Sequence, residues 1–287
     1  DTCTSWDLIK NSTKLFVCFG GVPLKNGQIC QGGTGNHYQK ESIISAASSG
    51  IEFVNVSPLK SDLMDEAGGK WLSLRPNTDT ALMLGIAHTL HIEGLSDKDF
   101  LNKYTEGFDI FLNYLLGFSD GIQKDANWAA EICDIPANEI KELARRMVSN
   151  RTMISVSWSL TRQDHGEQPF WMAIMLASMI GQIGLPGGGF GFGYSATNHI
   201  GGQFTILPGA AFPQAKNEIE NFIPVARISD LLLKPNENFN FDGKKYKYPD
   251  TKIVYWAGGN PFHHHQDLNR LIKAWEKPDT IICNEWC

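Results

Sequence analysis

The chain has 287 residues and a formal net charge of −6. This length is enough for one large domain or two ordinary ones, with a sizeable core. The negative charge and the lack of Lys- or Arg-rich blocks argue against nucleic acid as the main partner, and no apolar run approaches the roughly 20 residues of a transmembrane helix. We therefore expect a soluble protein without membrane insertion.

The N-terminus begins with Asp1 and lacks the basic-then-apolar layout of a signal peptide, so we expect processing or truncation. The compartment, periplasmic or cytoplasmic, stays open. The six cysteines form no C-x-x-C pair, which favours small buried thiols over a disulfide framework. Cys283 and Cys287 are spaced as C-x-x-x-C without further His or Cys partners nearby, so zinc is not expected.

The first segment with clear periodicity predicts a strand, a helix and a second strand. Residues 15–19 and 51–56 are short apolar runs ending in Gly20-Gly21 and in Ser57-Pro58, and residues 38–48 have helical spacing. This order predicts a parallel strand pair and the first half of a nucleotide-binding type of fold. The glycines do not match G-x-G-x-x-G, so an ordinary NAD site is disfavoured.

The middle of the chain predicts helical cover followed by another strand. A strong helix begins at Asp79 and ends near Gly94, and further helices are expected at 126–133 and 136–147. Residues 153–157 predict a strand, whose exit at 158–168 is dense in groups that hydrogen-bond or stack. A helix is expected to follow from about 169 to 183.

Residues 184–194 are so rich in glycine that we expect no regular structure there. A loop packed closely against a ligand or backbone is favoured over a flexible link, because three aromatic side chains in it need burial. The polar residues 235–249 predict a surface excursion or hairpin. Strands at 253–256 and 280–283 then flank a helix at 268–275, so the alternation is α/β throughout.

The run Gly258-Gly259-Asn260-Pro261-Phe262-His263-His264-His265-Gln266-Asp267 follows one of these strands. Three adjacent histidines suggest a metal, but successive residues of an extended chain point in alternating directions and cannot all face one ion. A strand-to-loop-to-helix crevice is the preferred interpretation, with Asn and His side chains donating to a polar or phosphorylated ligand. A metal site and a solvated turn without function remain alternatives.

Polar or glycine-rich sequences follow each predicted strand, where ligands bind in an open parallel sheet. These exits are 20–26, 55–60, 158–168, 258–267 and 284–285. Their spread suits an extended dinucleotide-like ligand better than a compact substrate. Asp164-His165 with Ser157 or Ser159 suggests a catalytic triad, but nothing orients the histidine, so structural or cofactor contacts are preferred.

Four stretches together resemble the dimethyl sulfoxide reductase family of molybdopterin enzymes. They are WSLTRQDHGEQ at 158–168, GLPGGGFGFGY at 184–194, GGNPFHHHQD at 258–267, and residues 76–81. Within the family the chain is most similar to the trimethylamine N-oxide, dimethyl sulfoxide and biotin sulfoxide reductases. The resemblance implies a parallel-sheet, Rossmann-like domain over residues 1–245 and the truncated start of a second related unit over 246–287.

The resemblance also implies a cofactor, bis(molybdopterin guanine dinucleotide) molybdenum, and residues that hold it. Two of these residues, Trp158 and Arg162, would lie near the pterin and the metal cavity and are the candidate catalytic residues. No metal ligand is expected in this chain. The residues of the first dinucleotide would be Gly20, Gly21, Pro23 and Lys25, with Asn55, Ser57 and Pro58 at the nucleotide and Asp79 at the guanine N–H groups, and those of the second would be Gly259, Asn260, His264, Asn284 and Glu285.

The activity implied is reduction of a small S-oxide or N-oxide by oxygen-atom transfer, with electrons from a donor protein or reductant, in bacterial anaerobic respiration. Family members are much longer, so the chain resembles a central fragment that is inactive by itself. The alternatives are another molybdopterin oxidoreductase, of the nitrate reductase or formate dehydrogenase type, and a non-catalytic nucleotide-binding module.

Overall fold

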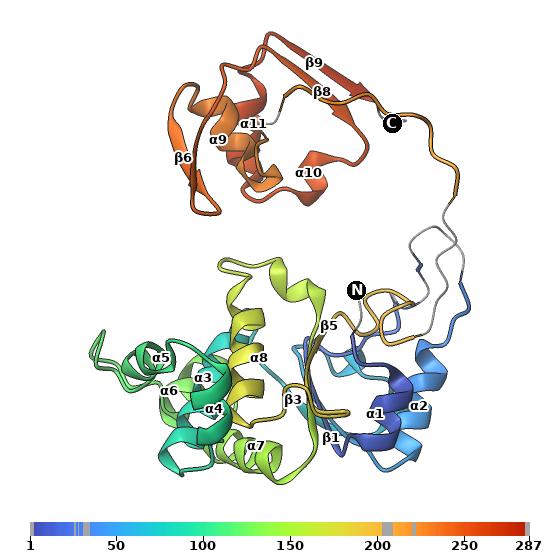
Figure 1. The fold of residues 1–287 in the computed structure, drawn as a ribbon, viewed down its shortest axis with the longest axis vertical. Coiled ribbons are helices and arrows are strands. Elements are labelled where there is room, and N and C mark those ends of the chain that lie inside the picture. The colour runs from blue at the N-terminus through green and yellow to red at the C-terminus, as the bar shows by residue number, and fades with distance from the viewer. Residues whose placement is uncertain are drawn as a thin grey trace. The chain divides into compact units, whose positions relative to one another are not determined.

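A computed structural model describes residues 3–25, 27, 29–30, 35–202, 209–219 and 222–284. The chain divides into two compact units, Asp1–Leu207 and Pro208–Cys287 (Figure 1). This division is based on compactness alone and lies before the expected domain boundary at residue 245. That boundary separates two cofactor-binding units and stays a prediction.

The first unit is built on a five-stranded sheet in which all neighbouring strands are parallel. The strand order is β3-β2-β1-β4-β5, so the direction of winding reverses between β1 and β4. The predicted α/β class with a parallel, Rossmann-like sheet is confirmed. The strands are β1 Leu15–Phe19, β2 Glu52–Val56, β3 Lys70–Leu72, β4 Thr152–Val156 and β5 Gly189–Phe192.

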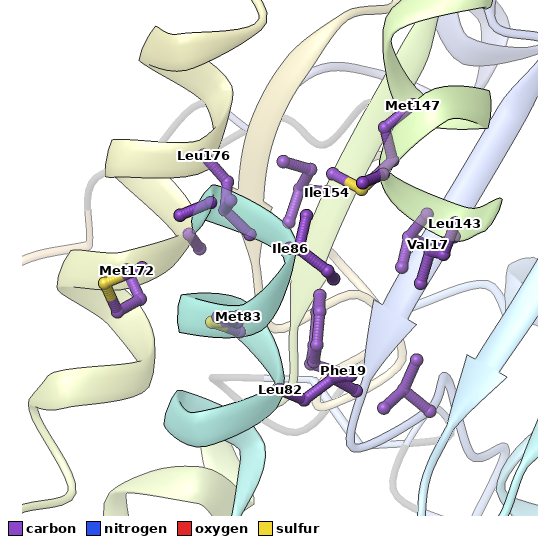
Figure 2. Close-up of a cluster of buried hydrophobic side chains, with 14 of the residues drawn as sticks. Val17, Phe19, Leu82, Met83, Ile86, Leu143, Met147, Ile154, Met172 and Leu176 are labelled. Atoms are coloured by element: carbon purple, nitrogen blue, oxygen red, sulfur yellow. The ribbon is translucent and has the colours of Figure 1, made fainter. Parts of the chain in front are cut away.

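Strands β1 and β4 are buried along their whole length because helices cover both faces of the sheet. In β1, Val17 and Phe19 belong to one buried cluster, whereas Phe16 and Cys18 belong to the cluster on the other face. All five residues of β1 are buried. Figure 2 shows the first cluster, in which side chains of α3, α7 and α8 meet those of β1 and β4.

Helices of this unit lie on both sides of the sheet (Figure 1). Residues of α1 and α2 share a cluster with Phe16 and Phe53, whereas α3, α6, α7 and α8 contribute to the other cluster. The α3 helix is buried along most of its length, since it lies between the sheet and further helices. The bounds are α1 Trp6–Ser12, α2 Gln39–Ser48, α3 Asp79–Ile92, α4 Lys98–Tyr104, α5 Phe108–Leu115, α6 Ala126–Cys133, α7 Ala137–Ser149 and α8 Gln168–Met179.

The expectation of no regular structure over 184–194 is wrong, because Gly189–Phe192 forms strand β5. Aromatic packing outweighs the entropic cost of glycine here: the rings of Phe192 and Phe170 lie 5.0 Å apart between centroids. A Cβ at Gly191 would lie 2.6 Å from Cε2 of Tyr194, so glycine admits that buried ring. The α8 helix also ends earlier than expected, at Met179.

The second unit contains the predicted hairpin and the predicted strand-helix-strand segment. The hairpin strands are antiparallel, whereas β8 and β9 pair in parallel around α11. The premise of an extended chain through the histidines is wrong, since Pro261–His264 is one helical turn. The bounds are α9 Ile228–Leu233, β6 Asn238–Phe241, β7 Lys244–Lys247, β8 Ile253–Ala257, α10 Pro261–His264, α11 Leu268–Trp275 and β9 Thr280–Asn284. No helix in the described ranges is long and apolar enough to cross a bilayer.

Candidate functional site

A cavity of about 500 Å³ lies at the carboxyl ends of β1 and β4. This is where the strand order reverses, which is the usual ligand position in open α/β sheets. The structure brings together five of the predicted site residues in its lining: Gly20, Pro23, Lys25, Trp158 and Arg162. Five further lining residues were not predicted as site residues: Asp62, Ser157, Ser159, Thr161 and Ala196.

Gly20 and Gly21 hold the β1 exit in direct contact with the exits of its neighbours. Gly20 has a φ of +77°, and a Cβ there would lie 2.5 Å from Cδ1 of Leu160. Gly21 has a φ of +70°, and a Cβ there would meet the main-chain oxygen of Asp62. Because a side chain at either position would collide with its neighbour, the cavity walls depend on these two glycines.

Trp158 and Arg162 come from the β4 exit, which turns into the short 3-10 helix η3, Trp158–Thr161. The indole of Trp158 lies against Gly193, where no Cβ fits, and 39% of the residue stays exposed. Arg162 follows η3 as its C-cap and is exposed. No carboxylate in the described part of the chain pairs with its guanidinium, so the charge is free to meet an anion.

Asp62 is the one carboxylate among the described residues that line the cavity, and sequence reasoning missed it. The hydroxyl of Ser57 donates to Oδ2 over 2.6 Å, and Nζ of Lys25 lies 3.3 Å from Oδ1. The main-chain oxygen of Asp62 accepts from the N–H of Val22 over 2.8 Å. An acid shortly after the second strand of a nucleotide-binding unit was the signal available in the sequence.

Asn55, Ser57 and Pro58 do not line this cavity. Asn55 is buried and lines a smaller cavity of about 190 Å³, and its amide donates to the carbonyl oxygens of Leu59 and Lys60. Its Oδ1 has no hydrogen-bond partner in the described structure. Ser57 is buried beneath Asp62, whereas Pro58 is exposed. The three predicted residues therefore occupy different environments at the β2 exit.

Asp79 is the first residue of α3 and is only 5% exposed. Burial raises the pKa of its carboxyl from 3.8 to about 6, although a backbone hydrogen bond opposes part of the rise. No side-chain donor among the residues described pairs with it, and it lines neither cavity named above. A buried carboxylate without such a partner suits a ligand that brings its own N–H donors.

In the second unit, the carboxyl ends of β8 and β9 lie side by side, with Ala257 in register with Asn284, and Gly259 and Asn260 follow β8. Asn260 caps α10, since its Oδ1 accepts from the N–H of Phe262 over 2.9 Å. The amide of Asn284 donates to the hydroxyl of Tyr255 over 2.6 Å, whereas His264 is exposed. Gly259 accepts from the indole of Trp256, and Glu285 lies outside the described residues.

Asp164 and His165 lie on an exposed turn, with side chains that are 99% and 76% exposed. The hydroxyls of Ser157 and Ser159 lie 3.0 Å apart and contact each other. In the described ranges neither serine is hydrogen-bonded to His165. The arrangement therefore gives no support to a catalytic triad, which requires the nucleophile to contact the base.

Comparisons with known proteins identify the family to which the chain is similar. The family described as "Molybdopterin oxidoreductase" matches residues 2–286. Biotin sulfoxide reductase of Cereibacter sphaeroides is 47% identical over 97% of this chain and 38% of its own length. Dimethyl sulfoxide/trimethylamine N-oxide reductase of the same organism is 45% identical over 99% of this chain and 36% of its own length.

Trimethylamine-N-oxide reductase of Haemophilus influenzae is 45% identical over 98% of this chain and 35% of its own length. The chain thus spans little more than a third of the curated relatives that it matches. Among solved structures, acetylene hydratase from Pelobacter acetylenicus aligns with a TM-score of 0.48 and 19% identity, over 61% of this chain and 22% of that one.

Proposed function

This chain belongs to the molybdopterin oxidoreductase family, and from this membership we propose that it is the central cofactor-binding part of a reductase that removes an oxygen atom from an S-oxide or N-oxide. The observation that carries the proposal is the cavity at the switch point of the sheet, in a chain similar along almost all its length to three such reductases. Since those relatives are much longer, we expect the chain alone to be inactive.

The described residues fit a molybdopterin guanine dinucleotide. The cavity lining supplies a cationic group for a diphosphate, on Lys25, and an exposed indole on Trp158 for stacking. The buried carboxylate of Asp79 suits a guanine edge, whose N1 and N2 atoms are both donors. When bound, the molybdenum centre supplies the oxygen-atom and electron transfer.

The residues of this chain position that cofactor and shape its surroundings. We assign Arg162 to ordering the cavity and polarising a bound oxide, because its exposed guanidinium lies in the lining without a described carboxylate partner. Trp158 forms one wall of the cavity, with its indole packed closely against Gly193. For a second dinucleotide we propose the strand ends of the second unit, with Gly259, Asn260, His264, Asn284 and Glu285.

The test is metal and nucleotide analysis of the full-length protein, followed by assays with S-oxides and N-oxides. We expect molybdenum together with guanine nucleotide, and oxide reduction that falls in an Arg162→Ala variant. Well-folded protein that contains no molybdenum would instead favour the alternative, a non-catalytic nucleotide-binding module. Turnover of nitrate or formate in place of the oxides would identify a different oxidoreductase of the same family.

A further inference from the structure

Asp62 lines the cavity from the β2 side but has no place in the proposed function so far. It ends the 3-10 helix η1, Lys60–Asp62, which follows β2. Only 12% of its side chain is exposed. Its backbone is fixed by the hydrogen bond from Val22 and by the close approach of Gly21, so the carboxylate is held in place on the cavity wall.

The carboxylate of Asp62 retains capacity to accept further hydrogen bonds. An ionised carboxylate has about four acceptor sites. Ser57 occupies one on Oδ2 and Lys25 occupies one on Oδ1, and no other side-chain donor to this carboxylate is found in the described ranges. The Lys25 ammonium also offsets the negative charge, which makes an anionic ligand tolerable beside Asp62.

The topology indicates which part of a nucleotide reaches this carboxylate. In open α/β sheets, phosphates lie at the exit of the first strand, and an acid beyond the second strand accepts from the ribose hydroxyls. Here the β1 exit carries Gly20, Gly21 and Lys25, and β2 is the neighbour of β1 on the side away from β4. A ligand with its diphosphate at Lys25 would therefore place its sugar beside Asp62.

We propose that Asp62 recognises the ribose of the bound guanine nucleotide by accepting hydrogen bonds from its hydroxyl groups. This inference rests on the proposed function and adds the sugar to it. Ser57 is then a positioning residue, because it reaches the ligand only through Asp62.

The experiment compares GDP with 2′,3′-dideoxy-GDP, which carries the same base and phosphates without the sugar hydroxyls. Their dissociation constants for the 287-residue chain are measured by calorimetry. We expect the wild-type chain to bind GDP about 10- to 100-fold more tightly, the discrimination of one hydrogen bond to a charged group. In Asp62→Ala the ratio should fall to about three or less.

The ratio separates recognition from a merely structural role. A loosened cavity or an altered charge changes the affinity of both ligands by the same factor, so their ratio stays constant. Loss of the acceptor weakens the binding of GDP alone, so the ratio falls. Asp62→Asn keeps the side-chain shape if the alanine variant misfolds, and its ratio should lie between the two. Glu66→Ala is the matched control, since Glu66 pairs with Lys40 over 3.8 Å on the surface and lines none of the cavities described here; its ratio should equal that of the wild type.

Two results would overturn the proposal for Asp62 and leave the proposed function standing. One is a wild-type ratio near one, and the other is a high ratio that persists in both Asp62 variants. A wild-type chain that binds neither nucleotide would also overturn it. In that case the proposed function is decided separately, by the molybdenum and nucleotide content of the full-length protein.

Discussion

Replacing Asp79 by asparagine should stabilise the chain at neutral pH while weakening guanine nucleotide binding. The carboxyl of Asp79 has a folded-state pKa of about 6, above its ordinary value of 3.8, because burial disfavours the charged form. Below pH 3.8 the carboxyl is protonated in both the folded and the unfolded state, so it makes no difference to the free energy of unfolding. As pH rises toward 6 the unfolded state releases its proton first, so the free energy of unfolding falls, and above 6 the loss is complete.

The magnitude follows from the size of the shift. A shift of roughly two pKa units corresponds to about 3 kcal/mol of unfolding free energy. The asparagine amide never ionises and escapes this penalty, although burying an amide without partners costs part of the gain. We therefore expect the Asp79→Asn variant to gain about 2–3 kcal/mol relative to the wild type between about pH 4 and pH 7.5.

Urea unfolding of both proteins at several pH values measures this difference directly. Asp109→Asn is the matched control, because Asp109 also lies in the first turn of a helix but is exposed. An exposed carboxylate has little desolvation to relieve, so the control should change stability by only a few tenths of a kcal/mol, as expected for a first-turn charge. A wild-type-to-variant difference that stays constant from about pH 4 to 7.5 would refute the reasoning.

Three further predictions concern the same unit. If guanine donors bind the ionised Asp79, GDP affinity should fall by up to tenfold per pH unit below about 6, and calorimetry that finds no pH dependence would contradict this. Gly193→Ala should lose about 1–3 kcal/mol of unfolding free energy and shift the Trp158 fluorescence, because its Cβ would collide with the indole. The control Gly50→Ala, at φ +89° with open space around its Cβ, should lose about 1 kcal/mol and leave the fluorescence spectrum unchanged. Gln39→Leu should lose about 2–4 kcal/mol, since the buried amide donates to the carbonyl oxygens of Asn198 and Ile200 and accepts from the Trp6 indole; a loss below about 1 kcal/mol in a thermal melt would show that these bonds contribute little.

Much of the fold could be predicted because its central strands are buried on both faces. The run at 15–19 is apolar without alternation and the run at 52–56 is mostly apolar, and glycine, serine or proline ends them, so the strands and the helix between them follow from local sequence. Strand β5 could not be predicted in this way. Its glycines disfavour a strand locally, and only the packing of Phe192 on Phe170 and the space for Tyr194 outweigh that preference.

Part of the cavity lining could be expected from sequence because the carboxyl ends of neighbouring parallel strands share one edge of the sheet. Gly20 directly follows β1 and Trp158 lies shortly after β4, and both line the cavity. Asp62 lies several residues beyond β2, and η1 returns it to the cavity. The sequence shows an acid shortly after this strand, but that its carboxylate reaches the cavity depends on the close approach of Gly21 and on the hydrogen bond from Val22.

The glycine contacts between the strand exits also limit how this site can be engineered. Gly20 touches the β4 exit, Gly21 the β2 exit, and Gly193 receives Trp158 from its neighbour. A single loop taken from a relative is shaped to pack against that relative's own neighbouring loops and would not fit the unchanged loops here. Altered ligand preference should therefore require exchanging the segments after β1, β2, β4 and β5 as one block, and chimaeras that exchange fewer should fold less well than either parent.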